Sequence, residues 1–161
     1  MDEVLDRIPV EPTNPELLAT LVAMQGQPLV RARPRKGGGL ALGFGQKVFH
    51  DKRRLIDPFY GEWEIGNFLG AWRIRRGDSI LFGSLDFIST TDVSLLPQLD
   101  GTSFQGLRQI GRFDFEVKLG FEMCADYFSV GGDEDVIHIF GPNELVAGYR
   151  VGCGWQLELR R

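Results

Sequence analysis

Two carboxylates separated by a single tryptophan are the first residues whose type and spacing could support catalysis. Glu62 and Glu64 flank Trp63, and side chains two positions apart project from the same side of a strand. A pair of carboxyl groups can act as general acid and general base where their surroundings separate their pKa values. Arg73 and Arg75 repeat the two-residue spacing and would supply positive charge. Because any solvent-facing strand carries alternating acids, the set is a candidate for a carboxylate-dependent enzyme and no more.

A run of acidic residues further along the chain is a candidate for binding another protein. Asp133, Glu134 and Asp135 are consecutive, and Asp126 lies shortly before them. Carboxylates gathered on one surface speed the encounter with a basic partner and disfavour wrong partners. The run lacks the spaced acidic ligands and the closing Glu of an EF-hand loop. These four residues are therefore either part of a solvated loop or a surface that contacts a positively charged protein, and we do not expect them to bind calcium.

Positive charge gathers in the first third of the chain. Residues 31–39 read Arg-Ala-Arg-Pro-Arg-Lys-Gly-Gly-Gly, and residues 52–54 read Lys-Arg-Arg. The glycines do not make a phosphate-binding loop, because no Gly-Lys-Ser/Thr follows to open a helix. The first stretch predicts a flexible basic hinge and the second a solvated loop.

Metal and thiol chemistry have little support in the sequence. His50 and His138 have no second histidine at helical or strand spacing, and His138 is predicted to be a hydrogen-bonded histidine of the core. Cys124 and Cys153 lie far apart and lack a Cys-x-x-Cys pattern, so neither a disulfide framework nor a zinc site of the usual spacing is expected. We expect no metal ligand set and no cofactor.

The charge balance disfavours nucleic acid as a partner. The 161 residues carry a formal net charge of −4, whereas binding to phosphate groups needs a basic face. No apolar run approaches the roughly 20 residues needed to span a bilayer. The N-terminal Met-Asp-Glu-Val lacks the positive and apolar regions of a signal peptide. These features predict a cytoplasmic protein that does not bind membranes.

The residues that could do chemistry must be positioned by a short helix and a series of strands. Asn14 can cap a helix, Pro15 suits its first turn and Gly26 can end it. Leucines and a valine at positions 17, 18, 21 and 22 recur at helical spacing. The sequence therefore predicts an amphipathic helix near the N-terminus, whose apolar stripe either docks on the main sheet, the commoner case, or meets a partner.

Alternation of apolar and polar residues predicts that most of the remaining chain is strand. We expect a hairpin over 71–87 with its turn at Gly77-Asp78, and one long strand over 113–123. Further strands are expected over 136–140, over 145–151 and from Trp155 onward. The long strand alternates so strictly that one face should lie on a core and the other in water.

The expected fold is mainly β, a β-rich α+β arrangement with a short N-terminal helix. Its antiparallel sheet would form a sandwich or an open barrel. Leu-Ala-Leu-Gly-Phe-Gly at 40–45 echoes Val-Lys-Leu-Gly-Phe-Glu at 117–122, so two similar β-units are one way to build it. Residues 1–36 would form a helical segment with the basic hinge, and residues 37–161 the antiparallel β domain.

Residues 61–161 also resemble a known group of proteins. The resemblance is carried by Gly-Glu-Trp-Glu-Ile at 61–65, Ala-Trp-Arg-Ile at 71–74, Gly-Asp-Ser-Ile at 77–80 and Gly-Ser-Leu-Asp at 83–86, followed by Leu-Asp-Gly at 99–101, the strand over 113–123 and the strand of Trp155. In these features the chain is similar to a loose group of uncharacterised small bacterial β-rich domains, which includes toxin-immunity proteins. The resemblance implies an antiparallel fold and a protein-binding role, and it brings no catalytic motif.

Three functions follow as hypotheses. The first is a cytoplasmic protein-interaction domain, in particular a bacterial immunity protein whose acidic residues cover the basic active site of a cognate toxin. The second is a small-ligand-binding β-barrel that holds an apolar molecule among its aromatic residues. The third is an enzyme of unrecognised type that uses Glu62, Glu64, Arg73 and Arg75. Pairing of edge strands would allow a homodimer.

Overall fold

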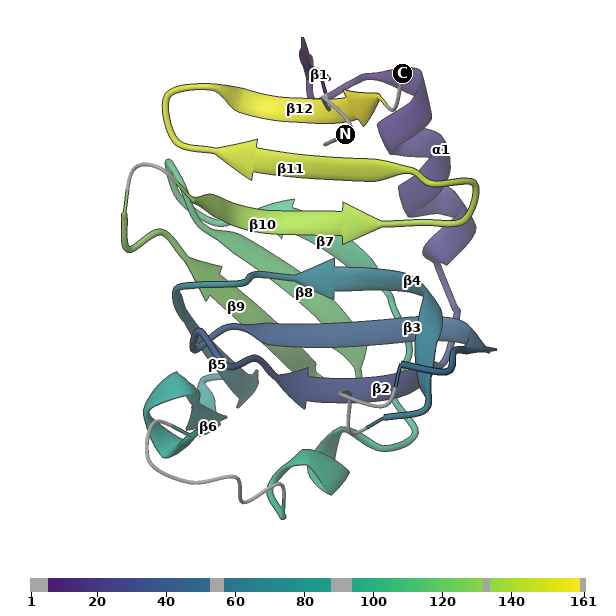
Figure 1. Ribbon diagram of the computed structural model, residues 1–161. Helices are drawn as coiled ribbons and strands as arrows, with labels where there is room; N and C mark the ends of the chain where they lie inside the picture. The colour runs from purple at the N-terminus through teal and green to yellow at the C-terminus, as the bar shows by residue number, and fades with distance from the viewer. Residues whose placement is uncertain (1–5, 53–56, 88–93, 132–133, 160–161) are drawn as a thin grey trace.

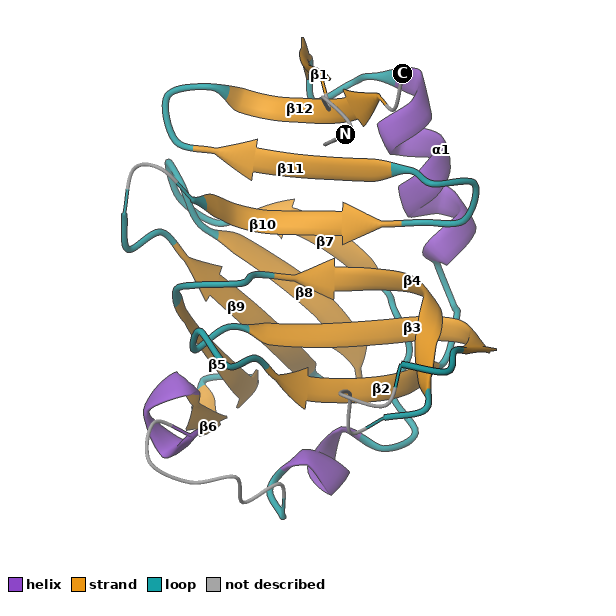
Figure 2. Ribbon diagram, viewed as in Figure 1, coloured by secondary structure: helices purple, strands orange, loops and turns teal. Residues whose placement is uncertain are grey.

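In the computed structural model the chain forms two antiparallel sheets that face each other, with one α-helix at their side (Figures 1 and 2). The structure describes residues 6–52, 57–87, 94–131 and 134–159. The seven-stranded sheet has the order β1-β12-β11-β10-β4-β3-β2, and the five-stranded sheet has the order β6-β5-β9-β8-β7. The expected mainly β, antiparallel fold is confirmed. It is a two-sheet arrangement and not a closed barrel.

The strands are short, and most of them pair with the strand that precedes or follows them in the chain. In spatial order the seven-stranded sheet contains β1 (Asp6–Val10), β12 (Gly154–Leu159), β11 (Val146–Arg150), β10 (Asp135–Phe140), β4 (Phe59–Gly66), β3 (Leu40–Phe49) and β2 (Leu29–Pro34). The five-stranded sheet contains β6 (Ser79–Gly83), β5 (Ala71–Arg76), β9 (Met123–Phe128), β8 (Phe115–Gly120) and β7 (Gly106–Gln109). The helix α1 covers Pro15–Met24, and two 3₁₀ helices cover Ser84–Phe87 and Leu96–Leu99.

The core lies between the two sheets and is rich in aromatic rings. Phe44 of β3 packs edge to face on Phe104 with ring centroids 5.6 Å apart, and Phe115 of β8 packs on Trp155 of β12 at 5.5 Å. The buried Tyr127 hydroxyl of β9 donates to the Leu40 carbonyl of β3 at 3.3 Å, which links the sheets by a polar contact. Because side chains from both sheets occupy this space, the aromatic residues serve packing.

The N-terminal helix is confirmed in place and length. The Asn14 side chain accepts hydrogen bonds from the backbone N–H groups of Glu16 and Leu17, as an N-cap does. Figure 1 shows α1 beside the ends of β10, β11 and β12. Leu17 and Met24 are buried, so the docked face is shifted by part of a turn from the predicted stripe.

Three strands were predicted in nearly the correct place at the C-terminal end of the chain. They are β10, β11 and β12, and they pair with one another in antiparallel order. The hairpin of β5 and β6 is also confirmed, with Gly77 at a φ of 55° in its turn. These elements depend on local alternation and on turn residues, which a sequence displays directly.

The prediction of a single long strand over 113–123 is wrong. The structure has a hairpin there: β8 ends at Gly120, Phe121 and Glu122 form the turn, and β9 begins at Met123. The register shifts between Lys118 and Gly120, so a bulge precedes the turn. The two similar segments, 40–45 and 117–122, therefore differ in structure. Residues 40–45 lie within β3, whereas residues 117–122 form the end of β8 and the turn that follows it.

The prediction of a flexible basic hinge over 31–39 is wrong for residues 31–34. Residues 31–34 belong to β2, which pairs with β3 along its length. The strand β1 was not expected, and it pairs with β12 at the other edge of the same sheet. Residues 1–36 thus contribute two strands to the sheet that the later residues complete.

Within the described residues, no helix has the length and apolar character needed to cross a membrane.

Candidate functional site

A cleft of about 1230 Å³ lies on the outer face of the seven-stranded sheet. Its walls come from β2, β4, the turn after β2, the loop after β4 and the turn after β10. Trp63 and Ile65 of β4 point into the core, so Glu62 and Glu64 project to the opposite side, into the cleft. The expectation that these two carboxylates share one side of a strand is confirmed.

The floor of the cleft follows from the register of four neighbouring strands. One row across β10, β4, β3 and β2 consists of Phe140, Glu64, Gly43 and Arg31. The next row consists of His138, Gly66, Ala41 and Arg33. In the second row the small Gly66 and Ala41 lie between two large side chains, and in the first row Gly43 lies between Glu64 and Arg31. The sheet surface is therefore low in the middle, which allows long side chains to lie across it.

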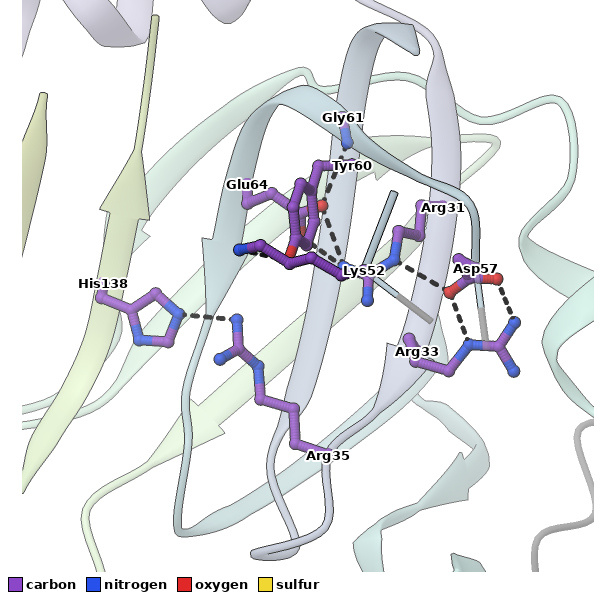
Figure 3. A network of polar contacts seen from close by, with 9 residues as sticks. All are labelled: Arg31, Arg33, Arg35, Lys52, Asp57, Tyr60, Gly61, Glu64 and His138. Carbon is purple, nitrogen blue, oxygen red and sulfur yellow. Dashed lines mark hydrogen bonds and ion pairs between the residues drawn. The ribbon is translucent and has the colours of Figure 1, made fainter. Parts of the chain in front are cut away.

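An ion-pair network occupies one end of the cleft (Figure 3). Arg31 donates to Asp57 at 2.9 Å through Nε and to the two oxygens of Glu64 at 3.0 and 3.1 Å through Nη1. Arg33 also donates to Asp57, at 2.8 Å through Nε. Glu64 in addition accepts from the Gly61 backbone N–H at 3.1 Å. Burial opposes ionisation of Asp57, but the hydrogen bonds from Arg33 and Arg31 outweigh it and hold the pKa of Asp57 below its usual value.

Gly43 makes room for this network. A Cβ atom at Gly43 would lie 3.0 Å from Oε1 of Glu64 and 3.1 Å from Cβ of Arg31. Both contacts are tighter than carbon atoms normally make. A side chain at this position would push apart the arginine and the carboxylate that meet above it.

A second set of contacts joins Arg35, Phe68 and His138. Arg35 Nη2 lies 3.2 Å from Nε2 of His138, and the Arg35 guanidinium carbon lies 4.0 Å from the centroid of the Phe68 ring. The ring of Phe68 stacks on His138 with centroids 4.4 Å apart. His138 is only 1% exposed, although it stands on the outer face of the sheet. The prediction that His138 is buried and hydrogen-bonded is confirmed, but its place in the core is wrong, because the side chain lies on the outer face under Phe68 and Arg35.

The protonation of His138 follows from its surroundings. Burial, together with the positive charge of Arg35, lowers the pKa of His138 to about 3. The imidazole is therefore neutral at physiological pH, and Nε2 accepts the hydrogen bond that Arg35 donates. His138 orients Arg35 without neutralising its charge.

Arg35 differs from the other arginines of the cleft in its partners. Arg31 and Arg33 each form ion pairs with carboxylates, whereas Arg35 forms none with any residue in the described part of the chain. Its Nε is buried and has no hydrogen-bond partner there. Burial lowers the pKa of Arg35 from its ordinary value, which expresses the cost of holding this charge away from water.

The loop after β4 lies close against the glycine-rich turn after β2. The Gly39 N–H donates to the Phe68 carbonyl at 3.1 Å, and Trp72 Nε1 donates to the Gly38 carbonyl at 3.0 Å. A Cβ atom at Gly39 would lie 2.1 Å from the Asn67 carbonyl oxygen. The glycines are needed because two backbone segments approach each other closely here. This approach places Phe68 above the sheet.

The enzyme candidate Glu62, Glu64, Arg73 and Arg75 is not assembled. Arg73 and Arg75 belong to β5 of the other sheet, and each donates to Asp126 at 2.8 Å. Arg75 also pairs with Glu116. Spacing along a strand shows which side chains share a face but not which sheet the strand joins. The two pairs therefore separate.

The acidic residues expected to bind a protein are also dispersed. Asp126 is fully buried under Arg73 and Arg75. Asp135 accepts two hydrogen bonds from Arg7, at 3.1 and 2.8 Å, and lies 3.4 Å from Nε of Arg150. Glu134 is exposed, and Asp133 lies outside the described residues. Two of the three described carboxylates are thus paired within the chain.

Several cleft residues were not recognised from the sequence. Phe68, Tyr60 and Asp57 carried no signal, because each is brought to the cleft by a loop or a neighbouring strand. Arg31, Arg33 and Arg35 were read as a hinge, yet their spacing of two is the spacing of a strand face. Of the second basic run, Lys52 lies at the rim, 3.4 Å from the Tyr60 hydroxyl, and residues 53–54 lie outside the described part.

No cluster of three or more histidine, cysteine or acidic side chains suited to a metal ion occurs among the described residues. Cys124 is buried and Cys153 exposed, and both are free thiols. No family model, curated protein or solved structure matches this chain. The resemblance to small bacterial β-rich domains stays a prediction.

Proposed function

We propose that this chain is a binding protein for a small molecule, which it holds in the cleft on the outer face of the seven-stranded sheet. The observation that carries the proposal is the cleft of about 1230 Å³, in which apolar walls and a few oriented polar groups converge. Binding sites for small molecules are concave, mostly apolar and supplied with a small number of placed polar groups. Tyr60, Phe68 and Phe140 provide the apolar walls, and Arg35 and Glu62 provide the polar groups.

The proposal keeps the ligand-binding hypothesis but moves the ligand out of the fold interior. A barrel would hold its ligand between strands, whereas here the space between the sheets is occupied by packed side chains such as Phe44 and Tyr127. The outer face of a sheet is open to solvent. A ligand can therefore enter and leave the cleft without separation of the sheets.

Catalysis by the cleft carboxylates is less well supported than binding. Glu64 is held by Arg31 and by the Gly61 N–H, so it is fixed as an acceptor of hydrogen bonds. A general acid and base pair needs two carboxyl groups whose proton affinities differ and which both face a substrate. Binding requires only the surface and the charges that are present.

Binding of a basic protein, a toxin in particular, stays a prediction. Of the residues proposed for it, Glu134 is exposed, whereas Asp126 and Asp135 have arginine partners. A cytoplasmic location and a homodimer through edge strands also stay predictions.

Titration of the isotope-labelled protein with 2-naphthol and with 2-naphthoate, followed by amide NMR shifts, tests the proposal. We expect saturable shifts at residues 35–37, 60–64 and 68–69 with at least one of these compounds. Phe68→Ala should weaken binding by about tenfold, because it removes one aromatic wall. Phe121→Ala is the matched control, since Phe121 is an exposed phenylalanine in the β8–β9 turn, at the end of the other sheet. If neither of these compounds nor 2-naphthyl phosphate gives saturable shifts in the cleft, the proposal is wrong.

A further inference from the structure

The side chains that line the cleft carry more positive than negative charge, whereas the whole chain has a negative net charge. Five cationic side chains line it: Arg31, Arg33, Arg35, Lys36 and Lys52. Three carboxylates line it: Asp57, Glu62 and Glu64. Among the described residues the lining therefore carries an excess of two positive charges, in a protein whose formal net charge is −4. A local excess of this kind attracts anions from solution.

The ion pairs show which of these cations is available to a ligand. Arg31 and Arg33 hold Asp57 and Glu64, so their charges are compensated. Arg35 is half-buried and has a neutral histidine as its hydrogen-bond partner. Burial of a guanidinium without a carboxylate in hydrogen-bond contact costs folding free energy, and a bound anion would offset part of that cost. Arg35 lines the cleft, and no acid of the described chain lies within ion-pair distance of it.

The orientation of Arg35 suits a planar or tetrahedral oxyanion. Its guanidinium packs on Phe68 at 4.0 Å, and His138 accepts one of its hydrogen bonds. These two contacts restrict the rotation of a long side chain, so less conformational entropy is lost when an anion binds. Guanidinium groups bind carboxylates and phosphates through two parallel hydrogen bonds. The exposed Lys36 and Lys52 at the rim add charge without competing for the same geometry.

We propose that the ligand is an aromatic acid, whose carboxylate or phosphate group binds Arg35 while its ring lies on the apolar walls formed by Tyr60, Phe68 and Phe140. The inference rests on the proposed small-molecule function and names its chemical class. A carboxylate and a phosphate ester share the chemistry that Arg35 recognises.

Three compounds with the same ring system test the inference: 2-naphthyl phosphate, 2-naphthoate and the neutral 2-naphthol. We expect the two anions to bind the wild-type protein at least about tenfold more tightly than 2-naphthol at low salt, and the difference to shrink as salt is added. The stronger of the two anions identifies the preferred head group. This comparison needs no variant and is unaffected by changes in folding.

Arg35→Gln locates the effect. It should reduce the affinity for both anions by about tenfold and leave that for 2-naphthol unchanged. Arg108→Gln is the matched control, because it removes an exposed arginine from the other sheet. If Arg35→Gln does not fold, Lys36→Gln, at an exposed position, should still weaken the anions alone.

The possible results separate the two proposals. Equal affinities for 2-naphthol and the anions would overturn the inference and leave small-molecule binding in place. An Arg35→Gln variant that loses 2-naphthol as readily as the anions would give Arg35 a structural role only and would also overturn it. If none of the three compounds binds in the cleft, small-molecule binding fails, and the inference with it.

Discussion

Carboxylates on the outer faces of both sheets are less exposed than their position in a strand implies. Glu64 is 6% exposed and Asp126 is 0% exposed, although alternation places both on faces turned away from the core. Arginine side chains lie over them and supply hydrogen bonds in place of water. At the scale of the residue, a polar position therefore shows which way a side chain points and not whether water reaches it.

The buried His138 should make stability depend on pH. Its pKa is lowered to about 3 in the folded protein, compared with about 6.5 in an unfolded chain. The unfolded state therefore binds more protons below pH 6.5, and stability falls as the pH falls. We expect this histidine to account for a loss of about 2 kcal/mol in unfolding free energy between pH 7.5 and pH 5. Urea denaturation at a series of pH values measures it.

The variant His138→Gln isolates this contribution. Glutamine keeps an acceptor for Arg35 but does not titrate, so the slope between pH 7.5 and 5 should flatten even if the variant is less stable overall. Val22→Gln, at an exposed residue that does not titrate, is the control and should keep the wild-type slope. An unchanged slope in His138→Gln would show that other groups cause the pH dependence.

At the scale of the element, the β8–β9 hairpin explains why the prediction of one long strand over 113–123 is wrong. Phe121 and Glu122 have φ angles of 52° and 61°, and Gly120 before them has a φ of 84°. The bulge at this point keeps Val117, Leu119 and Met123 all on the core side. The alternation in the sequence therefore continues through the turn without interruption, and period-two patterning cannot reveal that the chain has reversed.

Substitutions in the same turn should make the protein more stable. Two consecutive residues with positive φ favour Asn-Gly, and a bulky residue in this region costs about 1 kcal/mol. The double substitution Phe121→Asn with Glu122→Gly should therefore raise the free energy of unfolding by about 1–2 kcal/mol. Chemical denaturation measures the change. Phe121→Ala alone, which removes the exposed ring but keeps the strained backbone, should give no comparable gain, and an equal gain would contradict the strain argument.

At the scale of the whole molecule, the two ends of the described chain meet in one sheet. Strand β1 pairs with β12 from Asp6–Leu159 to Val10–Trp155, and Arg7 reaches Asp135 of β10 with two hydrogen bonds. The N-terminal strand thus closes an edge that β12 would otherwise expose. Its contacts join residues that are far apart in the sequence.

Removal of residues 1–10 should therefore weaken the entire fold. We expect the free energy of unfolding to fall by about 2–4 kcal/mol, because ladder hydrogen bonds are lost and Asp135 loses its bidentate partner. The exposed β12 edge should also promote self-association, which light scattering detects. Removal of residues 1–5 alone is the control for shortening the chain. A truncated chain as stable as the control would contradict the role assigned to β1.

Local patterns in the sequence by themselves determined the helix at Asn14-Pro15, the turn at Gly77 and the strands β10, β11 and β12. Each of these depends on residues within a few positions of one another, where capping, turn chemistry and alternation act directly. Only the tertiary structure decided which strands became neighbours. Period-two alternation is compatible with many pairings, and the choice among them depends on long-range packing.

The candidate site was likewise decided only by the tertiary structure. The row of Arg31, Gly43, Glu64 and Phe140 exists because β2, β3, β4 and β10 pair in one register. Arg35 meets Phe68 and His138 because glycines allow a loop and a turn to touch. The sequence showed that arginines and carboxylates were present. Their partners, and hence which charge remains for a ligand, depended on contacts between residues far apart in the chain.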